Sequence, residues 1–229
     1  MMRAMLRIGA AVAALLVAGA AHATIVTSIS GSTLSPDFKG AVVGSTYITF
    51  EDVAAGTGGA FTSGIASFSG DGFVETGTIV NKFAMPAGDT TNYLATGFIK
   101  KGLNVETATF STGYTKFGLY WGSIDAYNKI IFKNGGTTIF QLNGGSVPAA
   151  VDNGNQTSDL SNKYVNFDFQ GKVFDEVIFE SARPSFEVDN LAVAGAIPEL
   201  PTWAMMLAGF GLVGLQMRRR KSLGANDVA

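Results

Sequence analysis

The C-terminal segment from Ile197 to Lys221 constrains this chain most, because it places an uncharged apolar run directly before four cations. The apolar run extends from Thr202 to Met217, and the basic cluster from Arg218 to Lys221. As a helix the run would reach roughly 24 Å, slightly less than the ~30 Å hydrocarbon core of a bilayer. Flanking basic side chains can cover such a mismatch by snorkelling. The segment therefore predicts a transmembrane helix at 202–217, with a buried helix of a folded domain as the alternative.

The side chains at the two ends of this run predict its orientation. Trp203 lies where an interfacial aromatic residue is expected, and the basic cluster should stay on the cytoplasmic side. Residues 222–229 are then a short cytoplasmic tail, and everything before Ile197 lies across the membrane.

A short Pro/Glu peptide precedes the apolar run. The order of peptide, run and basic cluster resembles the PEP-CTERM sorting signal of Gram-negative bacteria, in the variant with Trp-Ala-Met-Met after the Pro-Glu peptide. The residues that match this signal, at 197–221, are Pro198, Glu199, Trp203, Ala204, Met205, Met206, Gly209, Phe210, Gly211, Arg218, Arg219 and Arg220. Leu200 stands where the family usually has a second proline, and Pro201 follows it.

This resemblance implies a partner and a location. In the family, an exosortase-type membrane transpeptidase cuts near the Pro-Glu peptide and releases or re-anchors the protein outside. We therefore expect export across the inner membrane of a Gram-negative bacterium, transient anchoring in that membrane, and a final place at the cell surface or outside the cell. The same tail is also catalogued as an ice-binding-protein C-terminal segment, a label that carries no evidence of ice binding.

The N-terminal residues 1–23 predict a cleaved signal peptide. Arg3 and Arg7 precede an apolar stretch that starts at Ile8, and small residues occupy both recognition positions, Ala21 and Ala23. Cleavage after Ala23 would leave Thr24 as the first residue. A retained N-terminal anchor is the alternative.

Residues 24–196 remain as the exported part, a length that suits one domain with a proper core. This part contains ten Lys and Arg and sixteen Asp and Glu, for a formal charge of −6. No patterned basic surface is available to neutralise phosphates, so we expect no nucleic-acid partner. The chain has no Cys, so packing must hold an exported domain without disulfides.

The residue types of the exported part also exclude much chemistry. The single His of the chain is His22, inside the predicted signal peptide. Without His or Cys the domain has no Ser-His-Asp or Cys-His nucleophile and no zinc site of the usual nitrogen and sulfur ligands. The enzymes that remain open depend on carboxylates, as glycosidases do, or on Lys, Tyr or Ca²⁺.

The pattern of short alternating runs between Gly-rich turns is typical of β structure. Asn134-Gly135-Gly136 is a hairpin signal, because Asn-Gly tolerates positive φ. We expect an all-β fold, a single antiparallel β-sandwich or jelly roll, flanked by the signal helix and the transmembrane helix. The expected strands are 45–50, 65–68, 72–80, 93–99, 105–112, 117–121, 129–133, 137–142, 164–169, 173–180 and 185–193.

The stretch from Phe117 to Asn128 combines aromatic and polar residues in a pattern typical of sugar-binding faces. Rings stack on the apolar faces of sugars, while carboxylates and amides bind their hydroxyl groups. The candidate glycan-binding residues are Tyr120, Trp121, Asp125, Tyr127 and Asn128, with Tyr120 and Tyr127 as the exposed rings. The alternative is a core strand, with alternate residues of 117–121 facing inward, followed by a turn.

The stretch from Phe186 to Val193 changes its alternation at Asp189-Asn190, which predicts a bulge or twist there. It resembles the closing strand of jelly-roll carbohydrate-binding modules. In those modules an Asp on that strand often binds a structural Ca²⁺ together with acids of the opening strand. That resemblance implies a calcium site at Glu51, Asp52 and Asp189, whose oxygen ligands suit a hard cation. The alternative is a solvated acidic strand end.

Two functional classes follow. The first is a non-enzymatic surface or extracellular-matrix protein, sorted through its C-terminal signal and associated with exopolysaccharide. The second is a carboxylate-based glycan-active enzyme of jelly-roll fold, which needs two acids about 5 to 10 Å apart across a groove. Asp125 with Asp168 is one pair that the sequence cannot place in space.

Overall fold

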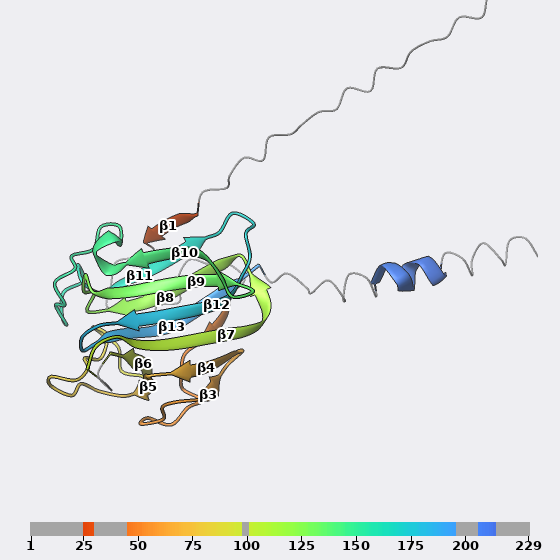
Figure 1. The fold of residues 1–229 in the computed structure, drawn as a ribbon. Coiled ribbons are helices and arrows are strands. Elements are labelled where there is room, and N and C mark those ends of the chain that lie inside the picture. The colour runs from red at the N-terminus through yellow and green to blue at the C-terminus, as the bar shows by residue number, and fades with distance from the viewer. Residues whose placement is uncertain (1–24, 30–44, 98–100, 196–205, 214–229) are drawn as a thin grey trace, which may run out of the picture.

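The computed structural model describes residues 25–29, 45–97, 101–195 and 206–213. Two antiparallel sheets lie face to face over residues 25–195, as Figure 1 shows. This confirms the predicted all-β, sandwich-like fold. Every strand pair in both sheets is antiparallel.

The strands follow one another across each sheet in a fixed order. The first sheet runs β1 (Val26–Ile29), β11 (Lys163–Asp168), β8 (Lys116–Gly122), β13 (Phe186–Ala194), β6 (Tyr93–Thr96) and β5 (Gly72–Glu75), and β2 (Thr46–Ile48) also pairs with β13. The second sheet runs β10 (Thr137–Asn143), β9 (Asn128–Asn134), β12 (Phe174–Ser181), β7 (Asn104–Tyr114), β4 (Ala66–Gly70) and β3 (Phe61–Ser63). One 3₁₀ turn, η1 (Gly144–Ser146), follows β10.

Local sequence explains most of these strands. In the β9–β10 hairpin, Gly135 and Gly136 adopt φ of 54° and 79°, and Asn134 pairs with Thr137, as the Asn-Gly-Gly turn predicts. The strands β1 and β3 were not predicted. Each has only three or four residues and lies at the edge of a sheet, so neither shows a readable alternation.

Aromatic rings fill the space between the two sheets. Phe132 of β9 lies 4.9 Å from Phe167 of β11 and 5.3 Å from Phe117 of β8, measured between ring centroids. Phe179 of β12 meets Phe186 of β13 at 5.7 Å. Such pairs contribute about 0.5 to 1.5 kcal/mol each beyond the area that they bury. These contacts join the two sheets into one core.

The outer face of the first sheet is also covered, by the segment 76–92 between β5 and β6. The Tyr120 hydroxyl donates to the Ala87 carbonyl at 2.6 Å, and the Tyr93 hydroxyl donates to the Gly77 carbonyl at 2.6 Å. At Gly122 a Cβ atom would lie 2.9 Å from Pro86, so the segment passes too close for a larger residue. Tyr120 is 1% exposed. The prediction of an exposed Tyr120 ring is therefore wrong, because this segment packs over it.

The predicted irregularity in β13 is confirmed. The register with β8 shifts between Asp189 and Ala192, and Asn190 adopts a φ of 49°. On its other side, β13 pairs with β6 before the shift and with β2 after it. The bulge therefore lets one strand serve two short partners.

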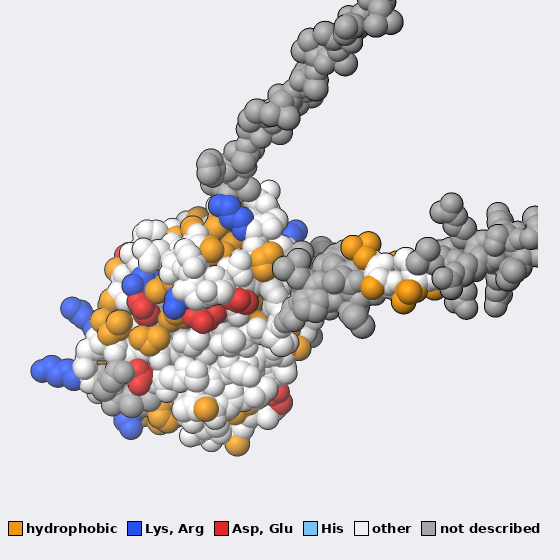
Figure 2. Space-filling model, turned by 45° about the vertical axis from the view of Figure 1, so that its right-hand side comes forward, with side chains coloured by type: hydrophobic (Ala, Val, Ile, Leu, Met, Phe, Trp, Pro, Cys, Tyr) orange, Lys and Arg blue, Asp and Glu red, His pale blue; other side chains and the backbone are white. Residues whose placement is uncertain are grey.

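Residues 206–213 form a helix whose apolar side chains are exposed, as Figure 2 shows. Phe210 and Leu207 are each 71% exposed, so this part of the predicted span does not pack into the β domain. No helix within the described ranges is long and apolar enough to cross a bilayer. The rest of the predicted span lies outside the described residues, as do the tail 222–229, the cleavage residues Ala21, Ala23 and Thr24, and the sorting residues Pro198, Glu199, Trp203, Arg218, Arg219 and Arg220.

Glu106 of β7 is a fully buried carboxyl group beneath the corner between β4 and β5. One of its oxygens accepts the Gly72 N–H at 2.7 Å, and the other has no hydrogen-bond partner in the described part of the chain. Burial raises the pKa of Glu106 from 4.5 to about 7, with a further contribution from the charge of Asp71. This carboxyl therefore links the stability of the fold to pH.

We expect the pH dependence of stability to fall when Glu106 is replaced by Gln. Because the folded pKa lies above the unfolded value, the carboxyl favours the folded state fully below about pH 4.5, and this contribution is lost as the pH rises through about 7. As the pH rises between those limits, the difference in unfolding free energy between Glu106→Gln and the parent should shift by about 3 kcal/mol in favour of the variant. Urea unfolding at a series of pH values measures this difference.

The matched control is Glu176→Gln on β12, where the carboxylate lies 3.1 Å from Lys133 on the outer face of the second sheet. That variant should show no comparable gain between the same pH limits. Parallel pH profiles for Glu106→Gln and the parent would contradict the assignment.

Candidate functional site

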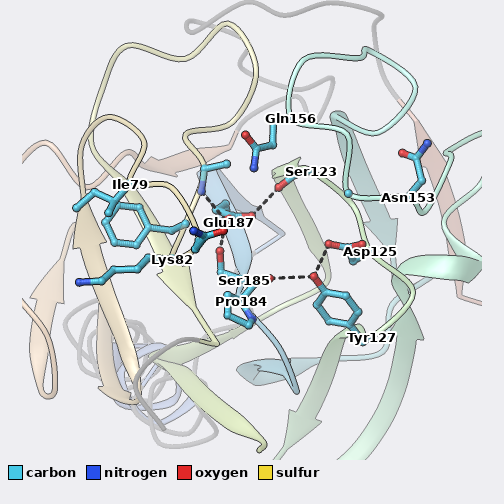
Figure 3. Close-up of a pocket in the computed structure, with 14 residues that line it drawn as sticks. Ile79, Lys82, Ser123, Asp125, Tyr127, Asn153, Gln156, Pro184, Ser185 and Glu187 are labelled. Carbon is cyan, nitrogen blue, oxygen red and sulfur yellow. Dashed lines mark hydrogen bonds between the residues drawn. The ribbon is translucent and has the colours of Figure 1, made fainter. Parts of the chain in front are cut away.

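A cavity of about 370 Å³ opens at the end of the sandwich where β8 finishes and β13 begins. Four loop segments line it: 79–84, 123–127, 153–156 and 184–187. Figure 3 shows Ser123, Asp125, Tyr127, Gln156 and Glu187 around one space. Loops held at one end of a rigid sandwich are a common place for binding sites.

Backbone hydrogen bonds hold the 123–128 turn against the 153–161 loop. The Ile124 N–H donates to the Ser161 carbonyl at 2.7 Å, and the Gly154 N–H donates to the Ile124 carbonyl at 3.0 Å. Gly154 has a φ of 65°, and a Cβ atom there would lie 2.7 Å from the Asp125 carboxylate. The glycine thus lets the loop backbone approach Asp125 directly.

Glu187 of β13 forms the floor of the cavity and joins three of its segments. One carboxyl oxygen accepts the Ala84 N–H at 2.9 Å and is also bonded to the Ser185 hydroxyl. The other oxygen is bonded to the Ser123 hydroxyl at 2.7 Å. Burial raises the pKa of Glu187, and these hydrogen bonds oppose the shift. Glu187 is 1% exposed, so it positions the loops around it.

Asp125 and Tyr127 form the wall of the cavity. The Tyr127 hydroxyl lies 2.5 Å from the Asp125 carboxylate and 3.0 Å from the Pro184 carbonyl, while the Arg183 guanidinium stands 5.5 Å from the centre of the ring. Burial raises the pKa of Asp125, and the hydrogen bond from Tyr127 opposes this. Burial is the main cause that raises the pKa of Tyr127, and the hydrogen bond to Asp125 raises it further. The Tyr127 hydroxyl therefore stays protonated and acts as a donor.

The other side chains that line the cavity are both polar and apolar. Asn153 and Gln156 add exposed amides, and Ile79 contributes an apolar side chain that is 47% exposed. Hydroxyl-bearing ligands with apolar faces suit such a lining, because amides and carboxylates bind hydroxyl groups while Ile79 and the Tyr127 ring contact C–H groups.

The structure brings two of the five predicted glycan-binding residues, Asp125 and Tyr127, to this cavity. Tyr120 is buried on the outer face of the first sheet. Trp121 is buried in the core and stacks on Phe186 at 4.5 Å, and Asn128 is buried and donates to the Ser185 carbonyl at 3.2 Å. The prediction that these three residues contact a glycan is therefore wrong. Trp121 lies in a core strand, as the alternative interpretation expected, and the buried Asn128 amide needs hydrogen-bond partners within the fold.

The carboxylate pair considered from sequence, Asp125 with Asp168, is not brought together. Asp168 pairs with Lys116 at the start of β8, whereas Asp125 follows the end of that strand. The second carboxyl of the cavity is instead Glu187. The sequence analysis did not single out Glu187. The signal that could have found it is an acid between two apolar residues, Phe186 and Val188, of a buried strand, where a carboxyl group needs hydrogen-bond donors from the protein.

The three acids of the predicted calcium site each have their own partners. Glu51 accepts the Asn92 N–H at 2.6 Å. Asp52 accepts the Ser63 hydroxyl at 2.5 Å and the Gly64 N–H at 2.8 Å, and these bonds lower its pKa. In the described ranges no three acidic, His or Cys side chains gather as a metal site.

Asp189 lies instead beside Asp89, and both are buried, at 0% and 3% exposed. The Thr91 hydroxyl lies 2.6 Å from Asp89 and 3.4 Å from Asp189. Burial and the charge of Asp89 raise the pKa of Asp189 well above its usual range. One oxygen of each Asp has no hydrogen-bond partner among the described residues. Asp189 is therefore the member of the predicted set that lies beside a second buried acid, and the calcium site stays a prediction.

No protein-family model, curated protein or solved structure matches this chain. The family suggested by the C-terminal segment therefore remains a prediction. A function for the chain can therefore be inferred only from the geometry of the cavity and from the segments at the two ends of the sequence.

We expect millimolar Ca²⁺ to raise the melting temperature if Asp189 takes part in a calcium site. A cation that binds only the folded state stabilises it by mass action, and tenfold saturation would correspond to about 1.4 kcal/mol, or roughly 3 °C for a domain of this size. Differential scanning fluorimetry with Ca²⁺ or a chelator measures the shift.

Asp189→Asn should remove the calcium response, while Asp159→Asn, an exposed acid on the 153–161 loop, should retain it. An unchanged melting temperature across the calcium series would dispose of the site.

Proposed function

We propose that this chain is an exported, non-enzymatic surface or extracellular-matrix protein whose β domain binds exopolysaccharide through the end cavity. It is carried across the inner membrane by its N-terminal signal peptide. Its C-terminal PEP-CTERM-type segment then holds it in that membrane until an exosortase-type transpeptidase processes it. The final location is the cell surface or the extracellular space.

Export and sorting are supported by the two ends of the sequence. Residues 1–23 have the charge, apolar stretch and small residues of a signal peptide. The 197–221 segment combines the Pro-Glu peptide, an apolar span and four cations, and the described helix 206–213 exposes its apolar side chains. A segment of this kind is more stable in lipid than in water.

Glycan binding is supported above all by the cavity at the end of the sandwich. Asp125, Asn153 and Gln156 supply acceptors and donors, and Ile79 and Tyr127 supply surfaces for C–H groups. Glu187 is bonded within the protein through both oxygens, which leaves Asp125 as the carboxylate available to a ligand. A rigid site with one available carboxylate favours binding over catalysis.

We further propose that the sandwich is a jelly roll, flanked in the precursor by a signal helix and by a transmembrane helix at 202–217. The antiparallel order of both sheets agrees with this topology. On the face that Figure 2 shows, basic side chains form no continuous patch, which supports a partner other than nucleic acid.

A second candidate function is a carboxylate-based glycan hydrolase. Its supporting observation is that two carboxyl groups, Asp125 and Glu187, line one cavity, and burial raises the pKa of both. A raised pKa is what a general acid requires. Catalysis by Glu187 would require it to release its bonds to Ser123 and Ser185 when substrate binds.

We expect processing in the native host to remove both terminal segments. The mature protein should start at Thr24 and end near the Pro-Glu peptide, and it should leave the membrane fraction. In a strain without the transpeptidase, the chain should keep Arg218 to Lys221 and remain in the inner membrane. Cell fractionation with intact-mass measurement tests both points, and full-length chain in the cytosol of the native host would overturn the proposal.

We expect Asp125→Asn and Tyr127→Phe to weaken binding of host exopolysaccharide by roughly tenfold each. The first variant removes the charge of the acceptor, and the second removes the hydroxyl that holds Asp125 in place, each worth about 1 to 2 kcal/mol. Tyr164→Phe is the matched control, because its hydroxyl donates to the Asn190 carbonyl away from the cavity. Equal binding by all three variants would remove the cavity from the proposal. Release of reducing ends, abolished by Glu187→Gln, would favour the hydrolase instead.

A further inference from the structure

A second cavity of about 370 Å³ lies beside the first. Thr78 and Met85 line this second cavity, and their chain neighbours Ile79 and Ala84 line the first. Gln156 lines both cavities. Because a single side chain borders the two spaces, a ligand longer than one unit can occupy both by passing Gln156.

Each cavity has one acidic side chain in its wall besides the internally bonded Glu187, and polar groups that a ligand can reach. Asp125 faces the first and is bonded to Tyr127. Asp89 lines the second, is 3% exposed, and has one oxygen without a hydrogen-bond partner in the described part of the chain. That oxygen is shielded from solvent, and the Asp189 carboxyl lies beside Asp89. The polar side chains of the second cavity that a ligand can reach are therefore the exposed Thr78, Gln156 and Thr157.

The charges around the two cavities select the class of ligand. Asp125 and Asp89 lie in the cavity walls, and Lys82 is the one basic side chain among the residues that line either cavity. A uronic-acid polymer would bring further negative charge against these acids, whereas hydroxyl or amino groups would donate to them.

We propose that the two cavities are adjoining subsites for one chain of neutral or amino sugars, at least two units long, with Gln156 between the units. The inference rests on the proposed glycan-binding function and adds the length and charge class of the ligand. One unit binds at Asp125, the next binds at the exposed Thr78 and Thr157 hydroxyl groups, and the Gln156 amide bonds to the groups near the linkage.

Titration calorimetry of the full chain, kept in a mild detergent, tests the proposal. The probes are glucosamine, N-acetylglucosamine and glucose oligomers of one to six units, with galacturonate oligomers as the anionic comparison. Affinity for at least one neutral or amino series should rise at least tenfold from one unit to two or three units. The galacturonate series should bind more weakly at every length.

The variant Thr157→Phe places a ring at the wall of the second cavity alone. It should lower the affinity for the longer oligomers to that of the single unit and leave the single unit unchanged. Asp159→Phe, two residues further along the same exposed loop and outside both linings, is the matched control and should bind like the parent.

The possible outcomes distinguish failure of the two-subsite inference from failure of the proposed glycan-binding function. Equal affinity at all lengths, with no effect of Thr157→Phe, would overturn the two-subsite inference while glycan binding stands. Stronger binding of galacturonate oligomers would overturn the ligand class. Binding of no oligomer and of no host exopolysaccharide would overturn the proposed function itself.

Discussion

The packing of aromatic rings between two sheets is the interaction on which the rest of this domain depends. The chain has no Cys, so no disulfide joins the sheets. Phe132 alone contacts four other rings of the core at 4.8 to 5.4 Å: Phe117, Phe167, Phe169 and Phe174. This core holds β8 and β13 in place, and the ends of those two strands carry Ser123, Asp125 and Glu187. The geometry of the cavity is thus a consequence of the core beneath it.

The segment 76–92 determines where the acids of the domain are buried. It covers the outer face of the first sheet, and Glu187, Asp189 and Asp89 all lie buried beneath it or within it. A carboxyl in such a place needs donors, and Glu187 obtains them from Ala84, Ser123 and Ser185. Asp89 and Asp189 together receive three donors, from the Thr91 N–H, the Thr91 hydroxyl and the Asn190 amide, so each keeps one buried oxygen without a partner among the described residues. One covering segment therefore creates both the rigid floor of the first cavity and the buried acid pair beside the second.

Sequence reasoning predicted what depends on neighbours along the chain. The strand expected at 164–169, the Asn134 hairpin and the irregularity at Asp189 rest on local patterns, and the structure has each of them. The exposure of Tyr120 and the placement of Asp125 depend on segments that are far away in sequence. No pattern within 117–128 could show that residues 76–92 pack over Tyr120, or that Glu187 meets Ser123. The position of a strand with a clear local pattern is therefore readable from its residues, while the side that is covered depends on the whole fold.

The two carboxyl groups of the first cavity differ in what a ligand would have to displace. Three donors reach the buried Glu187 carboxyl, so a ligand could bond to it only by breaking bonds that hold three segments together. Asp125 is fixed by the Tyr127 hydroxyl, which fills one of about four acceptor sites on a carboxylate. A sugar hydroxyl can therefore join Asp125 while Tyr127 keeps its bond, and the wall of the site stays in place on binding. In the proposed function, Asp125 is therefore the contact with ligand and Glu187 is the support behind it.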